Sequence, residues 1–271
     1  PDIDRIAFTG GTETAKKIIQ NSANNFAATN LELGGKSPLI IFEDADLESA
    51  ANGIIAGNFG ASGQSCVAGS RVIVHESIAQ KLMEIIKLKS QSIIVGDPLN
   101  VETHLGPLCT SKQIQTIEKI IAQSIEQGGE IIFGGKKIER EGNYFQPTLI
   151  HCPTQNIETL KIEMFGPVIS MIEFNNERDA IQIANDSKYG LGSGLFTKDL
   201  SRAHRVSQEI KAGICWVNTY RAISPIAPFG GFNQSGYARE GGKQAILDYT
   251  RTKTTWINTS DDPMINPFIM R

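Results

Sequence analysis

The chain of 271 residues is 40% hydrophobic and 20% charged, an ordinary composition for a globular protein of one large or two small domains. Its net charge of −3 offers no positive field for nucleic acid or for an anionic membrane surface. No apolar run reaches the roughly 18 residues that a membrane-spanning helix needs. We therefore expect a cytoplasmic protein that binds neither nucleic acid nor membrane.

Strands and helices alternate along the chain, and glycine-containing turns separate many of them. The predicted strands are residues 3–8, 30–33, 37–42, 71–74, 131–133, 144–150, 168–174, 191–196, 214–218 and 252–258. The predicted helices are residues 13–24, a segment ending near 58, and residues 77–90, 111–127, 179–185, 201–211 and 241–249. This alternation predicts an α/β fold with a mainly parallel sheet and helices on both faces.

Caps and loops delimit these elements. Asp44 and Asp46 are expected to cap the second helix, and Ser111 the fourth. Glycine and proline crowd residues 225–236, which predicts a long ordered loop. The polar, proline-containing tail after Asp261 is expected to run along the surface.

The cysteines and histidines are scattered along the chain. They are Cys66, Cys109, Cys152 and Cys215, and His75, His104, His151 and His204. The cysteines form no C-x-x-C pair, so we expect reduced thiols and neither a zinc site nor a disulfide framework. No histidine has a helical partner four residues away, so we expect no metal site.

The segment Gly60–Arg71 surrounds one cysteine, Cys66, with three glycines and several small residues. Glycine allows the backbone to approach a ligand closely, and small neighbours leave a thiol uncovered. The segment can therefore hold a nucleophile at the bottom of a cleft. The alternative is a structural cysteine in a tight turn, and local sequence alone favours it because free cysteine is commonly buried.

Glu32 is flanked by leucines at the end of a predicted strand, directly before Gly34 and Gly35. Ligands of α/β proteins bind at the carboxyl ends of strands. Partial burial there would raise the pKa of a carboxyl group and suit it to work as a general base. The alternative is a capping or exposed glutamate.

Three further segments carry candidate binding residues. Residues 8–12 form a strand, a glycine turn and the start of a helix, an arrangement that directs backbone N–H groups at a phosphate. Glu163 can hold ribose hydroxyls, and Phe165 can pack on a flat ring. Phe229, in a glycine-rich loop, can shape an apolar substrate mouth. Ordinary turns, a core phenylalanine and a structural loop are the alternatives.

Taken together, these segments resemble motifs of the aldehyde dehydrogenase superfamily. The matching motifs, in order, are Phe8-Thr9-Gly10-Gly11-Thr12, Leu31-Glu32-Leu33-Gly34-Gly35-Lys36, Gly63-Gln64-Ser65-Cys66, Glu163-Met164-Phe165-Gly166-Pro167 and Pro228-Phe229-Gly230-Gly231. Glu32 precedes Cys66 by 34 positions and Glu163 follows it by 97, spacings typical of that family. The resemblance extends from Ile3 to about Asn258.

The resemblance implies a role for each motif. Cys66 would attack the aldehyde, its backbone N–H would bind the oxyanion, and Glu32 would activate the water that hydrolyses the thioester. NAD or NADP would be the coenzyme. The implied coenzyme-binding residues are Gly10, Gly11, Thr12, Leu33, Glu163 and Phe165, and the implied substrate-binding residues are Val67 and Phe229. No metal is implied, and the partners would be an aldehyde and further subunits of a homodimer or homotetramer.

The resemblance also implies a domain organisation, that of the C-terminal part of such an enzyme. The expected parts are 1–34, the end of the coenzyme-binding domain; 35–234, the catalytic domain; 235–249, a return to the coenzyme-binding domain; 250–260, an oligomerisation strand; and 261–271, a tail. Gly11 and Ala15 stand where many members of the family have serine and glycine. The details of coenzyme binding at this turn are therefore left open. A coenzyme A-acylating enzyme and an inert fragment are the alternatives, and the presence of Glu32 favours hydrolysis over acylation.

Overall fold

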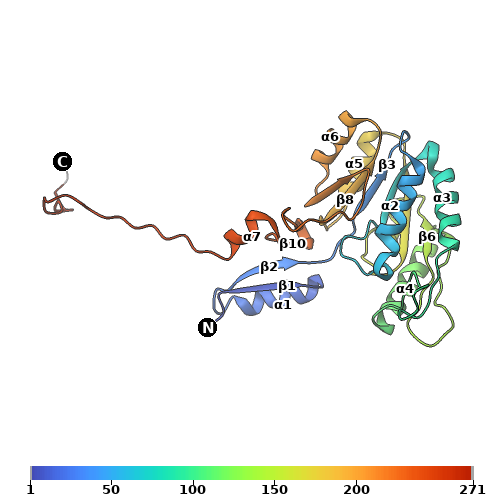
Figure 1. Ribbon diagram of the computed structural model, residues 1–271, viewed down its shortest axis with the longest axis horizontal. Coiled ribbons are helices and arrows are strands. Elements are labelled where there is room, and N and C mark those ends of the chain that lie inside the picture. Colours follow the sequence, from blue (N-terminus) through green and yellow to red (C-terminus); the bar gives the residue numbers. More distant parts are fainter. Residues whose placement is uncertain (1, 270–271) are drawn as a thin grey trace.

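A seven-stranded sheet forms the core of the computed structural model, which describes residues 2–269 (Figure 1). Its strand order is β5-β6-β7-β4-β3-β8-β9, and every neighbouring pair is parallel except β5–β6. The strands are β3 (Pro38–Ile41), β4 (Arg71–His75), β5 (Glu130–Phe133), β6 (Thr148–His151), β7 (Val168–Phe174), β8 (Gly192–Phe196) and β9 (Ile214–Val217). The predicted mainly parallel α/β fold is confirmed.

Helices cover both faces of this sheet. They are α2 (Leu47–Phe59), α3 (Glu76–Gln91), α4 (Ser111–Glu126), α5 (Glu177–Asn185) and α6 (Leu200–Glu209). Apolar side chains of α4, α5 and α6 pack on one face, and those of α2 and α3 on the other. Strand β3 alternates between the two cores: Ile40 faces the first, and Leu39 and Ile41 face the second. This burial on both sides explains the unbroken apolar run of the strand.

A smaller sheet lies at one end of the large one (Figure 1). Strands β1 (Arg5–Thr9) and β2 (Ala28–Glu32) are parallel, and β10 (Gly236–Tyr237) pairs antiparallel with β2. Helix α1 (Thr12–Ser22) connects β1 to β2, and α7 (Gly242–Asp248) follows β10. Because β2 leads directly through residues 33–37 into β3, the carboxyl end of the small sheet meets the amino end of the large one.

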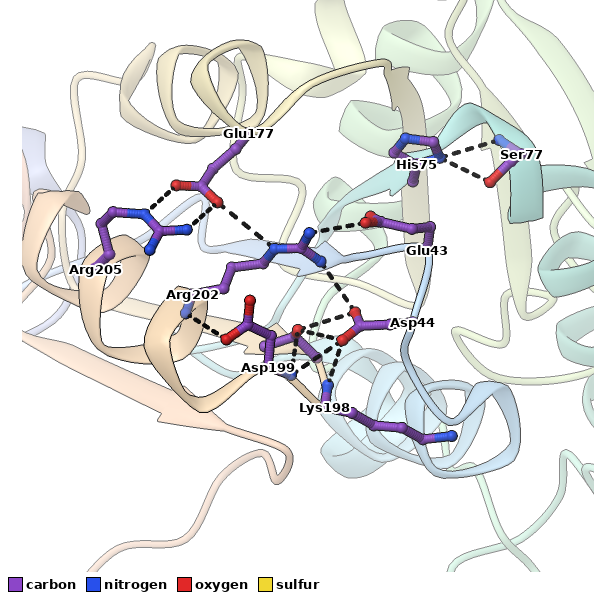
Figure 2. Close-up of polar contacts among 10 residues, drawn as sticks. Glu43, Asp44, His75, Ser77, Glu177, Lys198, Asp199, Arg202 and Arg205 are labelled. Carbon is purple, nitrogen blue, oxygen red and sulfur yellow. Dashed lines mark hydrogen bonds and ion pairs between the residues drawn. The ribbon is translucent and has the colours of Figure 1, made fainter.

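Two predicted helix caps differ from the observed ones. Asp46 alone caps α2, where its side chain accepts from the Ser49 N–H at 2.8 Å. Asp44 instead accepts from the Thr197 hydroxyl and from the N–H groups of Lys198 and Asp199, directly before α6. It also pairs with Arg202 (Figure 2). Helix α4 is likewise capped by Thr110 and not by Ser111, because α4 begins one residue after the threonine.

The predicted strand 144–150 is shorter in the structure, where β6 starts at Thr148. Pro147 has no N–H to donate to a ladder, and Phe145 forms an isolated bridge with Lys137 instead. The chain therefore enters the sheet only after the proline.

The C-terminal segment extends away from the rest of the chain (Figure 1). Residues 250–269 are exposed, and the side chain of Trp256 is 93% exposed. The tail does not run along the surface, contrary to expectation. Residues 252–258, expected to form a strand, pair with no strand among the described residues of this single chain. Pro1, Met270 and Arg271, which belong to the expected first and last parts, lie outside the described residues.

None of the helices over residues 2–269 combines the length and the apolar character that crossing a membrane would require.

Candidate active site

A pocket of about 600 Å³ opens where the two sheets meet. Its lining residues are Thr9, Gly10, Gly11, Glu32, Leu33, Gly34, Gln64, Ser65, Cys66, Gln113, Thr116, Glu163 and Phe165. The structure thus brings together seven of the ten residues expected to bind or react. Thr12, Val67 and Phe229 do not line this pocket.

Cys66 lies on a tightly turned loop between α2 and β4. Ala61 and Ser62 have φ of 55°, and Gly63 has φ of 72°. A Cβ on Gly63 would lie 2.2 Å from the carbonyl carbon of Gly166, so only glycine fits between the loop and the segment that carries Glu163. This close approach places the half-buried thiol of Cys66 in the pocket.

Burial raises the pKa of the Cys66 thiol, and the Glu163 carboxylate raises it further. The backbone N–H groups of Cys66 and Val67 oppose this rise, and the Glu32 carboxylate adds to it. The free thiol is consequently protonated near neutral pH, and a base must remove its proton before it can act as a nucleophile.

Glu32 ends β2 with a side chain that is only 5% exposed. Its Oε2 has no hydrogen-bond partner within the described part of the chain. Burial and the charge of Glu240 raise the pKa of Glu32 to about 8, and the charge of Arg239 opposes this rise. A carboxyl group with this pKa exchanges protons near neutral pH, as a general base must.

The sequence analysis did not predict that Glu240 and Arg239 affect the candidate site. Phe229 and Glu240 exchange two backbone hydrogen bonds of 2.7 Å, which fold the charged pair back toward Glu32. The signal that could have revealed them is a pair of adjacent opposite charges directly after a glycine-rich loop.

Glu163 lies beside the glycine pair that follows Glu32. Its Oε1 accepts from the Gly35 N–H at 3.0 Å, and a Cβ on Gly34 would lie 1.9 Å from its Oε2. Burial raises the pKa of Glu163, while the Gly35 N–H and the Lys36 charge lower it. Phe165 is 39% exposed at the pocket and has φ of 46°, a strained value for a bulky residue.

The predicted phosphate turn is only partly available for a ligand. The Gly10 N–H donates to the Glu32 carbonyl at 3.0 Å, and the Thr12 hydroxyl donates to the Gln234 carbonyl at 3.3 Å. Gly11 forms the N-cap of α1 without a side-chain cap, so the first backbone N–H groups of this helix have no partner within the helix.

An apolar cluster lies behind the thiol. Val67, Leu191 and Trp216 are buried there, and Cys66 and Phe229 pack against them. Val67 is only 3% exposed, so it supports the loop from inside and does not line the pocket. Phe229 likewise contributes to this apolar wall.

Lys36 is a further residue whose importance the sequence analysis did not predict. It is 1% exposed, and its Nζ finds no hydrogen-bond partner among residues 2–269. Burial, with the Arg71 charge, lowers the pKa of Lys36 to about 7. Protonated Lys36 therefore lowers the free energy of unfolding. This destabilisation disappears as the pH rises from about 7 toward the ordinary pKa of lysine.

The substitution Lys36→Met is accordingly expected to raise the free energy of unfolding by about 1–4 kcal/mol at pH 6. The gain should shrink as the pH rises, because the folded wild-type chain then carries a neutral lysine. Urea unfolding at pH 6 and pH 9.5 measures this, with the exposed Lys87→Met as the matched control. An equal change at both pH values would contradict the account of the buried charge.

Residues 2–269 contain no group of three or more His, Cys, Asp or Glu side chains that could hold a metal ion. The pocket presents the thiol of Cys66, the carboxyl group of Glu32 with its raised pKa, and the partly buried carboxyl group of Glu163. Residues 1–255 match the aldehyde dehydrogenase family. The chain belongs to the aldehyde dehydrogenase family.

Relatives with curated names support the same membership. The chain is 50% identical over 272 residues to the (Z)-2-((N-methylformamido)methylene)-5-hydroxybutyrolactone dehydrogenase of Acinetobacter baylyi, covering 100% of this chain and 56% of the relative. It is 38% identical over 262 residues to the betaine aldehyde dehydrogenase of Agrobacterium fabrum, covering 96% and 53%. The chain thus spans about half the length of the curated relatives it matches.

Solved structures of aldehyde dehydrogenases share the fold. PnpE in complex with nicotinamide adenine dinucleotide superposes with a TM-score of 0.94 at 42% identity, over 98% of this chain and 55% of PnpE. The NAD+ complex of an aldehyde dehydrogenase from Bacillus cereus superposes with a TM-score of 0.93 at 39% identity, over 96% and 53%. The family resemblance expected from the motifs is confirmed.

Proposed function

We propose that this chain carries the catalytic site of an enzyme that oxidises an aldehyde to a carboxylic acid with NAD+ or NADP+. The observation that supports this most directly is the shared pocket of Cys66 and Glu32. Cys66 supplies a nucleophile, and Glu32 supplies a base whose pKa is raised to about 8. Family membership and the NAD+ complexes of relatives supply the reaction class and the coenzyme.

The chain's own residues would act in two stages. In the first, the Cys66 thiol would lose its proton to solvent water, and the thiolate would add to the aldehyde carbon. The N–H groups of Cys66 and Val67 would stabilise the charge on the oxygen. The coenzyme supplies the hydride acceptor that turns this adduct into a thioester. In the second stage, Glu32 takes a proton from a water that attacks the thioester and releases the acid.

The residues on the coenzyme side of the pocket fit a nicotinamide ribose and its ring. The Glu163 carboxylate is fixed by the Gly35 N–H while it lines the pocket, so it can accept from sugar hydroxyls. Phe165 presents an exposed aromatic ring to the same space. At the carboxyl end of the small sheet, directly after β1 and β2, lie Gly10, Gly11, Thr12 and Leu33. We place the remaining coenzyme contacts there.

The domain assignment follows the two sheets and is part of this proposal. The small sheet, formed from residues 1–34 with the return over 235–249, belongs to the coenzyme-binding part. Residues 35–234 form the catalytic part around the large sheet. We assign 250–260 to pairing with a neighbouring subunit in a homodimer or homotetramer, because this segment is extended and exposed in the single chain, with 261–271 as a tail.

Covalent trapping tests the proposed function. The intact protein, given an aldehyde and NAD+ and quenched with acid within the first turnover, should carry an acyl group on the Cys66 peptide in mass spectra. The exposed Cys109, substituted as Cys109→Ser, serves as the control and should leave the adduct unchanged. An adduct on Cys109 alone, or no adduct while NADH forms, would contradict the assignment of the nucleophile.

A further inference from the structure

Tyr220 holds the loop that carries the proposed nucleophile from behind. It follows β9, and its hydroxyl donates to the Val67 carbonyl at 2.9 Å. Its ring centroid lies 4.8 Å from that of Trp216. The ring also packs against the apolar cluster in which Cys66 lies. Tyr220 thus contacts the residue that follows the nucleophile without facing the pocket.

The surroundings of the Tyr220 ring are shaped to admit it. Three glycines from different segments border it: Gly57 in α2, Gly69 after the nucleophile and Gly194 in β8. A Cβ on these residues would lie 2.7, 3.0 and 2.9 Å, respectively, from atoms of the tyrosine ring. Because three separate segments lack a side chain where the ring lies, the ring has one well-defined position.

The backbone around Tyr220 is strained and fastened on both sides. Asn218 has φ of 53° and Arg221 has φ of 63°. Asn218 Nδ2 donates to the Thr197 carbonyl at 2.8 Å, and Arg221 Nη1 donates to the Ala56 carbonyl at 3.2 Å. Strained backbone persists only where surrounding contacts enforce it, and such positions cluster at functional sites.

We infer that Tyr220 is a positioning residue, whose hydroxyl fixes the Cys66–Val67 turn so that its N–H groups stay directed at the thiolate and at the oxygen of the bound aldehyde. The inference rests on the proposed function of Cys66. Tyr220 acts through the Val67 carbonyl and touches neither substrate nor coenzyme.

The charges around the two groups agree with this role. Burial raises the pKa of Tyr220, so its hydroxyl stays protonated and donates across the working pH range. Among its neighbours, Ser37 and Arg221 lower this pKa, and Cys215 and Cys66 raise it. Around the thiol, Glu163 and Glu32 disfavour the thiolate, and the N–H groups of Cys66 and Val67 favour it. Loosening those N–H groups would therefore leave the two carboxylates unopposed.

The test is Tyr220→Phe, which keeps the ring and removes the hydroxyl. The rate of Cys66 alkylation by iodoacetamide, followed by peptide mass spectrometry against pH, should shift its midpoint upward by about one pH unit, a roughly tenfold slowing at neutral pH. In the intact enzyme kcat should fall about ten- to a hundredfold. The KM for NAD+ should stay within about twofold, because the coenzyme side of the pocket is untouched.

Matched variants separate positioning from general destabilisation. Tyr144→Phe removes a hydroxyl from another buried tyrosine outside the pocket and should leave both the midpoint and kcat unchanged. Introducing p-aminophenylalanine at position 220 restores an N–H donor and should restore the midpoint. If Tyr220→Phe fails to fold, p-fluorophenylalanine at position 220 fills the place of the hydroxyl without a donor and should show the same upward shift.

An unshifted midpoint with normal kcat in Tyr220→Phe would overturn the inference, as would equal losses in Tyr144→Phe or the absence of rescue by p-aminophenylalanine. The two levels of the proposal fail differently. Aldehyde oxidation at the wild-type rate in Cys66→Ala would refute the proposed function itself. Cys66-dependent oxidation that is indifferent to Tyr220→Phe would refute only the positioning role.

Discussion

Replacing Cys66 by alanine is expected to lower the rate of aldehyde oxidation by about 10⁴-fold or more, because Cys66 is the one cysteine among the described residues that line the pocket. Coenzyme binding should survive, since the thiol is not among the proposed coenzyme contacts. Steady-state formation of NADH with an aldehyde panel measures the first effect, and fluorescence titration with NADH measures the second.

The serine neighbour offers a sharp control for this result. Ser65 also lines the pocket, one residue before Cys66, and Ser65→Ala should retain most of the activity. If Cys66→Ala oxidised aldehydes at the wild-type rate, the nucleophile would have to be sought elsewhere. A combined loss of activity and of NADH binding would instead point to collapse of the loop.

Replacing Glu32 by glutamine is expected to separate the two chemical stages. The first burst of NADH should remain, while steady turnover falls about 10²- to 10⁴-fold because no base activates water toward the thioester. The acyl group should accumulate on Cys66 and be visible in mass spectra. Rapid-mixing absorbance at the NADH band, compared with the steady rate, measures both parts.

The pH dependence of the wild-type enzyme follows from the same residue. Burial and Glu240 raise the pKa of Glu32 to about 8, so the basic form is the minor one at pH 7 and accumulates as the pH rises through 8. The deacylation rate should therefore increase about tenfold per pH unit below that value and level off above it.

An exposed glutamate provides the comparison for Glu32. Glu173 lies on the surface and pairs with His151, outside the pocket, so Glu173→Gln should leave the burst, the turnover and the pH profile unchanged. Normal turnover in Glu32→Gln with water as the acceptor would remove Glu32 from the mechanism. Recovery of that variant by coenzyme A alone would support the acylating alternative.

Periodicity and turn residues predicted most of the fold, because the elements of the large sheet depend on local patterns. Strand β7 was predicted with its observed bounds, and α1 within two residues at each end. The predictions failed where a distant contact decides. Asp44 is drawn away from α2 by Thr197 and Arg202, which lie more than 150 residues further along the chain.

The site shows the same division. Motif order identified Cys66, Glu32, Glu163 and Phe165, which the structure gathers in one pocket; their roles remain proposals. The roles argued above for Lys36, Tyr220 and Glu240 were not predicted. Their importance comes from burial without a partner, from a ring enclosed by three glycines and from a charge folded back toward Glu32, and none of these is a property of neighbouring residues in the sequence.

The meeting of the two sheets has a mechanical consequence. The proposed base ends one sheet, and the proposed nucleophile precedes a strand of the other, so their separation depends on how firmly the sheets are joined. Ser235 fastens that joint: its hydroxyl donates to the Gly34 carbonyl at 2.6 Å and accepts from the Gly190 N–H at 3.0 Å, while its own carbonyl accepts from the Leu33 N–H at 3.0 Å. The position of the proposed base relative to the proposed nucleophile should therefore depend on one fully buried serine, through the angle that it helps to fix between the two sheets.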